Sequence, residues 1–142
     1  MISEKKETKL REFVNEINDS RFVKIVNRAL ENWKLYNPEK EWIGVSIIQM
    51  PLAENSGNTR YKIIPVKKIN NIYYNCCLMG ASMIGMNVNY SILIDSIKKT
   101  YNINDDEIYG ITAGFDQMKM EGEYKSSNFY KWSYHISEII FS

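Results

Sequence analysis

Two cysteines and one histidine are the residues of this chain whose chemistry could support catalysis. Cys76 and Cys77 are adjacent, and they open an apolar segment, CCLMGASMIGM, whose spacing predicts a short helix. A thiol at a helix N-terminus has a lowered pKa, because the partial positive charge there stabilises the thiolate. Cys76 or Cys77 is therefore a candidate nucleophile, and His135, the only histidine of the sequence, is the candidate base.

The chain order of cysteine before histidine resembles that of papain-like cysteine hydrolases. The resemblance implies a donor for the developing oxyanion, and the side-chain amide of Asn70 or Asn71 could supply it. The match is partial, because neither a Cys-Gly nor a Cys-Ser-Gly motif follows the cysteines. Glu138 is the only acid after His135, and along a strand it would point to the opposite face. A cysteine hydrolase or transferase is thus the alternative hypothesis, and we expect a chain without enzymatic activity.

Metal and cofactor signatures are weak. Adjacent cysteines and one histidine supply at most three of the four ligands of a structural zinc ion. Asn102, Asn104 and Asp106 match alternate positions of a calcium loop, but Glu107 replaces its glycine and Ala113 its final glutamate. Neither GxGxxG nor GxxxxGK[ST] occurs, so we expect no metal and no cofactor.

Aromatic side chains provide the main indication of binding. The sequence contains ten tyrosines and three tryptophans, and tyrosine supplies contact area at low entropic cost in binding surfaces. The same rings could instead line the edge of the core with their polar tips in water. The candidate binding residues are Tyr73, Tyr74, Tyr124, Tyr130, Trp132 and Tyr134.

The elements that must position these residues follow from hydrophobic periodicity. Spacings of three and four predict two helices between residues 3 and 36, separated near Asn18 to Ser20 and ended by Asn37-Pro38. Alternation predicts strands around residues 43–47 and 61–63, joined as a hairpin. Three short helices are predicted between residues 75 and 115, the third capped by Asn104.

The last segment, NFYKWSYHIS, alternates between apolar and polar residues and predicts a strand. With the hairpin it would complete a small antiparallel sheet of about three strands. We therefore predict an α+β fold in which the sheet packs with two N-terminal helices and the central group of three short helices. A length of 142 residues corresponds to a single globular domain, residues 1–142.

Charge and hydropathy limit the partners. Eighteen basic residues against 17 acidic ones predict weak affinity for nucleic acid. The segment from Tyr90 to Gln117 has the outline of a helix-turn-helix, but Asp105, Asp106 and Glu107 would repel phosphates. No segment approaches the roughly 18 apolar residues of a membrane span. With no apolar leader and with its adjacent cysteines, the chain is expected in the cytoplasm.

These observations predict a small cytoplasmic protein that binds another protein, as an inhibitor or adaptor. Its richness in Ile, Asn, Lys and Tyr is typical of AT-rich genomes, which include those of phages and other mobile elements. An open sheet edge and surplus aromatic residues would also let two copies associate as a homodimer. A second alternative is a small-ligand pocket beside Gly80 and Ser82, where the small side chains of the predicted helix leave space.

Overall fold

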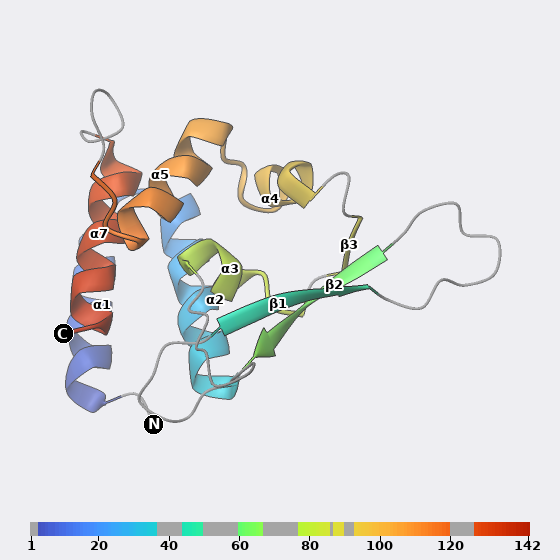
Figure 1. Ribbon diagram of the computed structural model, residues 1–142. Coiled ribbons are helices and arrows are strands. Elements are labelled where there is room, and N and C mark those ends of the chain that lie inside the picture. Colours follow the sequence, from blue (N-terminus) through green and yellow to red (C-terminus); the bar gives the residue numbers. More distant parts are fainter. Residues whose placement is uncertain are drawn as a thin grey trace.

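Figure 1 shows the computed structural model of the chain, in which helices lie side by side at one end and a small sheet extends from the other. The residues that the structure describes are 3–36, 44–49, 60–66, 77–85, 87–89, 93–119 and 127–142.

The N-terminal helices are α1 (Glu4–Asn15) and α2 (Ser20–Tyr36). The Ser3 hydroxyl accepts a hydrogen bond from the Lys6 N–H at 3.2 Å and caps α1. At the start of α2, the Asp19 carboxylate accepts from the Arg21 N–H at 3.0 Å, and the Asp19 carbonyl accepts from the Val23 N–H. Asp19 therefore caps the start of α2, within the segment Asn18 to Ser20 where the sequence predicts that the two helices separate. The apolar residues of α2 that recur at spacings of three and four are all buried: Phe22, Ile25, Val26, Ala29, Leu30 and Trp33.

Two lysines connect α1 to neighbouring helices. The Lys34 ammonium lies 2.7 Å from a carboxylate oxygen of Glu7 and joins α2 to α1. The Lys6 ammonium donates to the Ile140 carbonyl at 2.6 Å. This second contact places a cation at the C-terminus of the last helix, where the partial charge of the helix is negative.

The sheet consists of β1 (Gly44–Gln49), β2 (Arg60–Val66) and β3 (Asn87–Asn89), in the order β1-β2-β3. Both pairs of neighbouring strands are antiparallel. The register places Gly44 opposite Val66 and Gln49 opposite Tyr61, while Arg60 lies opposite Asn89. The third strand is therefore Asn87–Asn89 and not the C-terminal segment.

The central helices are α3 (Leu78–Ser82), α4 (Leu93–Tyr101) and α5 (Asp105–Phe115). Helix α5 begins with a capping box. The Asn104 side chain accepts from the Glu107 N–H at 2.9 Å, and the Glu107 carboxylate accepts from the Asn104 N–H at 3.1 Å. The N-cap predicted at Asn104 is thus confirmed.

The C-terminal segment predicted as a strand forms helix α7 (Asn128–Ile140), so that prediction is wrong. The residues that α7 buries recur at spacings of three and four: Phe129, Tyr130, Ser133, Ile136, Ser137 and Ile140. The alternating pattern predicts a strand because it places Ser133 and Ser137 on a solvent-exposed face. Both serines are buried, and the Ser133 hydroxyl donates to the Ile111 carbonyl of α5 at 2.6 Å.

The predicted α+β fold class is also wrong. In the part of the chain whose side chains are described, 77% of residues are helical and none lies in a strand. The buried apolar residues of that part come from helices and from the residues that connect them, such as Ile17 and Ile103. The described core is therefore formed between helices rather than on the face of a sheet.

Helices α5 and α7 pack at unusually close range. A Cβ atom at Gly114 would overlap the carbonyl oxygen of Tyr130, so only glycine fits there. One turn earlier, a Cβ at Gly110 would lie 3.5 Å from the Tyr130 nitrogen, which is an ordinary contact. The small residues of the two helices thus let their backbones approach.

Among the helices that the structure describes, none combines the length and the apolar character needed to cross a membrane.

Candidate functional site

Cys77 occupies the N-cap position of α3, and its sulfur lies 3.9 Å from the hydroxyl oxygen of Thr112 on α5. Burial raises the pKa of this thiol, and the nearby Asp116 carboxylate raises it further. Hydrogen bonds to the Gly80 backbone and to Thr112 act in the opposite direction and offset only part of the increase. Helix α3 has only five residues, and the hydrogen bonds from its first turn do not outweigh the effect of burial. Cys77 is therefore protonated at neutral pH.

A Cys76→Ser variant, which leaves Cys77 as the only thiol, tests this conclusion. We expect iodoacetamide at pH 7.5 to alkylate the folded protein at least ~10-fold more slowly than the urea-unfolded protein, because the thiolate is the reactive form. Intact-mass spectrometry over time gives both rates. Equal rates in the folded and unfolded protein would show that Cys77 is an accessible nucleophile.

His135 lies on the exposed face of α7, with half of its side chain accessible. Its Nδ1 is 3.5 Å from a carboxylate oxygen of Glu138, and its ring contacts that of Phe13 on α1 with centroids 4.5 Å apart. The expectation that Glu138 points away from His135 is wrong, because residues three apart on a helix share a face.

The structure does not unite the described members of the predicted catalytic set. Cys77 contacts α5, whereas His135 contacts α1 and its own helix. Cys76, Asn70 and Asn71 lie outside the described residues.

Three of the predicted aromatic binding residues belong to α7, and all three contribute to packing. Tyr130 is 8% exposed, and its hydroxyl donates to the Met118 carbonyl at 2.5 Å. The Tyr134 ring lies 6.1 Å from that of Tyr130, and the half-buried Trp132 ring lies 5.2 Å from that of Phe22. Tyr73, Tyr74 and Tyr124 lie outside the described residues.

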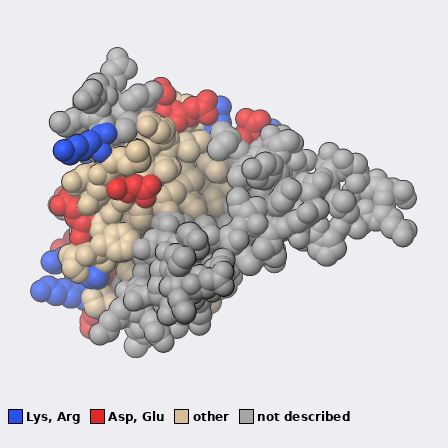
Figure 2. Space-filling model, in the orientation of Figure 1, with Lys and Arg blue, Asp and Glu red and all other residues tan. Residues whose placement is uncertain are grey.

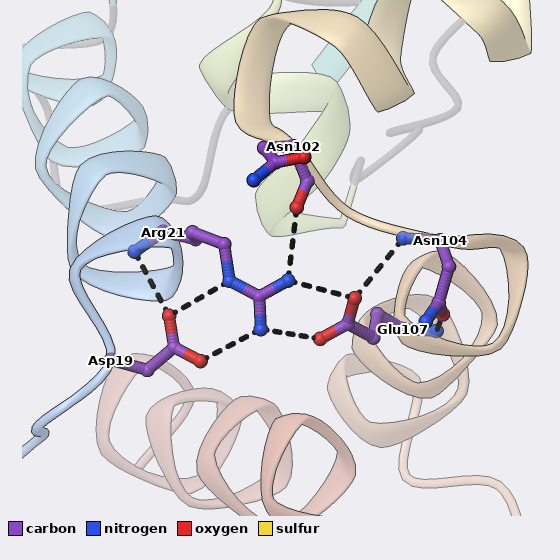
Figure 3. Close-up of polar contacts among 5 residues, drawn as sticks. All are labelled: Asp19, Arg21, Asn102, Asn104 and Glu107. Carbon is purple, nitrogen blue, oxygen red and sulfur yellow. Dashed lines mark hydrogen bonds and ion pairs between the residues drawn. The ribbon is translucent and has the colours of Figure 1, made fainter.

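Arg21 organises a polar cluster that the sequence does not predict (Figure 3). Its guanidinium lies 2.9 Å from the Asp19 carboxylate and 2.7 Å from the Glu107 carboxylate. It also donates to the Asn102 carbonyl at 2.9 Å. These contacts lower the pKa of Asp19 and raise that of Arg21. The guanidinium and both carboxylates are engaged with one another, so the cluster holds the start of α2 against the α4–α5 connection.

The calcium-loop residues have structural roles. Asn102 adopts a positive φ of 55° directly after α4, a conformation that asparagine tolerates. Asn104 caps α5. Within the described ranges, no group of three His, Cys, Asp or Glu side chains is arranged to hold a metal ion.

A hollow of about 390 Å³ lies between the C-terminal ends of α5 and α7, and we call it the α5–α7 hollow. It is lined by Phe115, Asp116, Gln117, Ser137 and Phe141. The Phe141 ring is 51% exposed and meets the Phe115 ring edge-on at a centroid distance of 5.8 Å. Sequence analysis missed this site because Phe115 and Phe141 follow from no motif and meet only in the folded chain.

Figure 2 shows mostly uncharged atoms at the helical end of the described surface, with an acidic patch among them and further charged side chains toward the edges. A mixed apolar and polar surface of this kind is typical of protein interfaces.

Comparisons with protein-family models, with curated proteins and with solved structures found no match to this chain.

Proposed function

We propose that this chain acts by binding another protein, and that the α5–α7 hollow receives an apolar side chain of that partner. The observation that carries the proposal is the half-exposed Phe141 ring beside the hollow. Aromatic residues near a pocket often dominate the energy of protein interfaces.

The position of the thiol supports binding over catalysis. The pKa of Cys77 is raised by burial, and its sulfur contacts Thr112, whereas a nucleophile requires a base within hydrogen-bond reach. The second alternative, a ligand pocket beside Gly80 and Ser82, receives little support. Ser82 is fully buried, and its carbonyl accepts from the Tyr101 hydroxyl at 3.2 Å.

A role as an inhibitor or adaptor, a cytoplasmic location and an origin in a phage or other mobile element complete this proposal. The location rests on the two adjacent cysteines of the sequence, which suit a reducing compartment.

Charge introduced at Phe141 tests the proposal. We expect Phe141→Asp to reduce recovery of a specific partner at least ~10-fold in quantitative co-purification, because a carboxylate would be desolvated at the interface. Leu35→Asp is the matched control, since Leu35 is 69% exposed at the end of α2. Circular dichroism and the melting temperature of each variant check that it is folded at the temperature of the assay.

Equal recovery of all partners by the two variants would contradict the proposal. Analytical ultracentrifugation of the purified chain tests whether a second copy of the chain occupies the α5–α7 hollow. Self-association that Phe141→Asp abolishes would show that a second copy fills the hollow, and that result would also overturn binding of a different protein.

A further inference from the structure

A second hollow, of about 570 Å³, follows one face of α2, and we call it the α2 hollow. Its helical lining residues recur at spacings of three and four from Ser20 to Arg28, so they form one stripe along the helix. The complete lining is Ile17, Asn18, Ser20, Val23, Lys24, Asn27 and Arg28. The α2 hollow shares no lining residue with the α5–α7 hollow.

Two cations lie one helical turn apart in this stripe. Lys24 and Arg28 repel each other at that spacing, which destabilises an isolated helix slightly. Both lie near Tyr101 of α4. The Lys24 ammonium is 5.8 Å from the centre of the Tyr101 ring, and Arg28 is close enough to its hydroxyl to affect its pKa. Lys24 and Arg28 therefore lie on the same side of α2, next to Tyr101.

Neither cation forms an ion pair with an acidic side chain in the part of the chain that the structure describes. Among the described residues, ion pairs join Arg11, Arg21, Lys34 and Lys98 to carboxylates, but none involves Lys24 or Arg28. Against the described residues alone, these two positive charges are available to an external anion.

The rest of the α2 hollow favours a peptide. Ile17 and the half-buried Val23 provide an apolar surface beside the cations, and Asn18 and Asn27 provide amides. A nucleic-acid backbone would require a longer basic track. Here the exposed Glu31 follows Arg28 on the same face, and the net charge of the chain is only +1.

We propose that the α2 hollow binds a short acidic peptide segment of a partner protein. One apolar side chain of the segment lies against Ile17 and Val23, and flanking carboxylates pair with Lys24 and Arg28. This site is independent of the α5–α7 hollow.

A fluorescein-labelled synthetic peptide of leucines flanked by glutamates is the probe, and fluorescence anisotropy at low salt measures its binding. We expect saturable binding that Lys24→Glu/Arg28→Glu weakens at least ~10-fold, because two charge pairs are replaced by repulsion. The matched control is Lys9→Glu/Lys131→Glu, which changes the net charge equally at two exposed positions outside the hollow. It should weaken binding less than ~2-fold.

A peptide with serine in place of leucine should bind more weakly to the wild-type chain. Circular dichroism confirms that each variant is folded. The Phe141→Asp variant should bind the peptide normally, so failure at one hollow is distinguishable from failure at the other.

Three outcomes would overturn the proposal. The first is the absence of saturable peptide binding, and the second is an equal loss of affinity in the control variant. The third is tighter binding of a single-stranded oligonucleotide of the same charge, which would identify a nucleic-acid ligand.

Discussion

Replacing Gly114 by alanine is expected to lower the free energy of unfolding by about 2–3 kcal/mol. The added Cβ would overlap the Tyr130 carbonyl oxygen, and it would also crowd the Ser133 Cβ at 3.2 Å. Backbone atoms cannot rotate away as a flexible side chain can, so α5 and α7 must separate. Urea denaturation followed by circular dichroism measures the loss.

Gly110→Ala is the matched control for this prediction. Its Cβ would meet the Tyr130 nitrogen at 3.5 Å, an ordinary contact, and alanine favours a helix over glycine by about 0.5–1 kcal/mol. We expect Gly110→Ala to be neutral or slightly stabilising. Similar losses in the two variants would mean that Gly114 is not at a point of close helix contact.

Replacing Arg21 by methionine is expected to lower the free energy of unfolding at pH 7 by about 1–2 kcal/mol. The substitution leaves the Asp19 and Glu107 carboxylates without their shared cation. The side chain of Arg21 is 33% exposed, that of Asp19 24% and that of Glu107 19%. Solvent therefore screens part of the attraction between these charges. Arg11→Met is the control, because Arg11 is 54% exposed and forms only a surface pair with Glu7. That control should cost less than about 0.5 kcal/mol.

The Arg21 prediction includes a pH dependence. The pKa of Asp19 is lowered from its ordinary value of 3.8 in the folded protein, mainly by its hydrogen bonds from the Arg21 side chain. The stabilisation from this pairing is therefore complete above pH 3.8 and is lost as the pH falls through the lower folded value. The difference in stability between wild type and Arg21→Met should shrink as the pH falls below that ordinary value. A difference that grows on acidification would contradict the pairing of Asp19 with Arg21.

The sequence predicts those features that depend on local chemistry. Asn104 could be identified as an N-cap because the hydrogen bonds of a cap join residues only three apart. The buried stripe of α2 could be identified from Phe22 to Trp33, because a long amphipathic helix repeats its pattern over several turns.

The sequence of α7 predicts a strand because its apolar residues fit the two-residue period of a strand as well as the 3.6-residue period of a helix. Tyr130, Trp132, Tyr134 and Ile136 alternate with polar residues, but the helix buries Ser133 against Gly114 of α5 and also buries Ser137. A buried serine cannot be distinguished from an exposed one by polarity alone, and only the contact with α5 decides between them.

The candidate sites depend on contacts between distant residues and could not be predicted. The Arg21 and Glu107 positions are 86 residues apart, and Phe115 meets Phe141 only because α5 packs on α7. The catalytic hypothesis could be formed from residue types, but the environment of Cys77 depends on Thr112 and Asp116 of another helix.

The proposed binding face and the predicted effect at Gly114 both require that residues 128–140 form a helix packed on α5. Nuclear magnetic resonance of the isotopically labelled chain tests this most directly. We expect helical Cα chemical shifts across Asn128–Ile140, together with nuclear Overhauser contacts between the Gly114 Hα and the Ser133 Hβ protons. Extended-strand shifts in this segment, with cross-strand contacts to residues 44–66, would contradict the account.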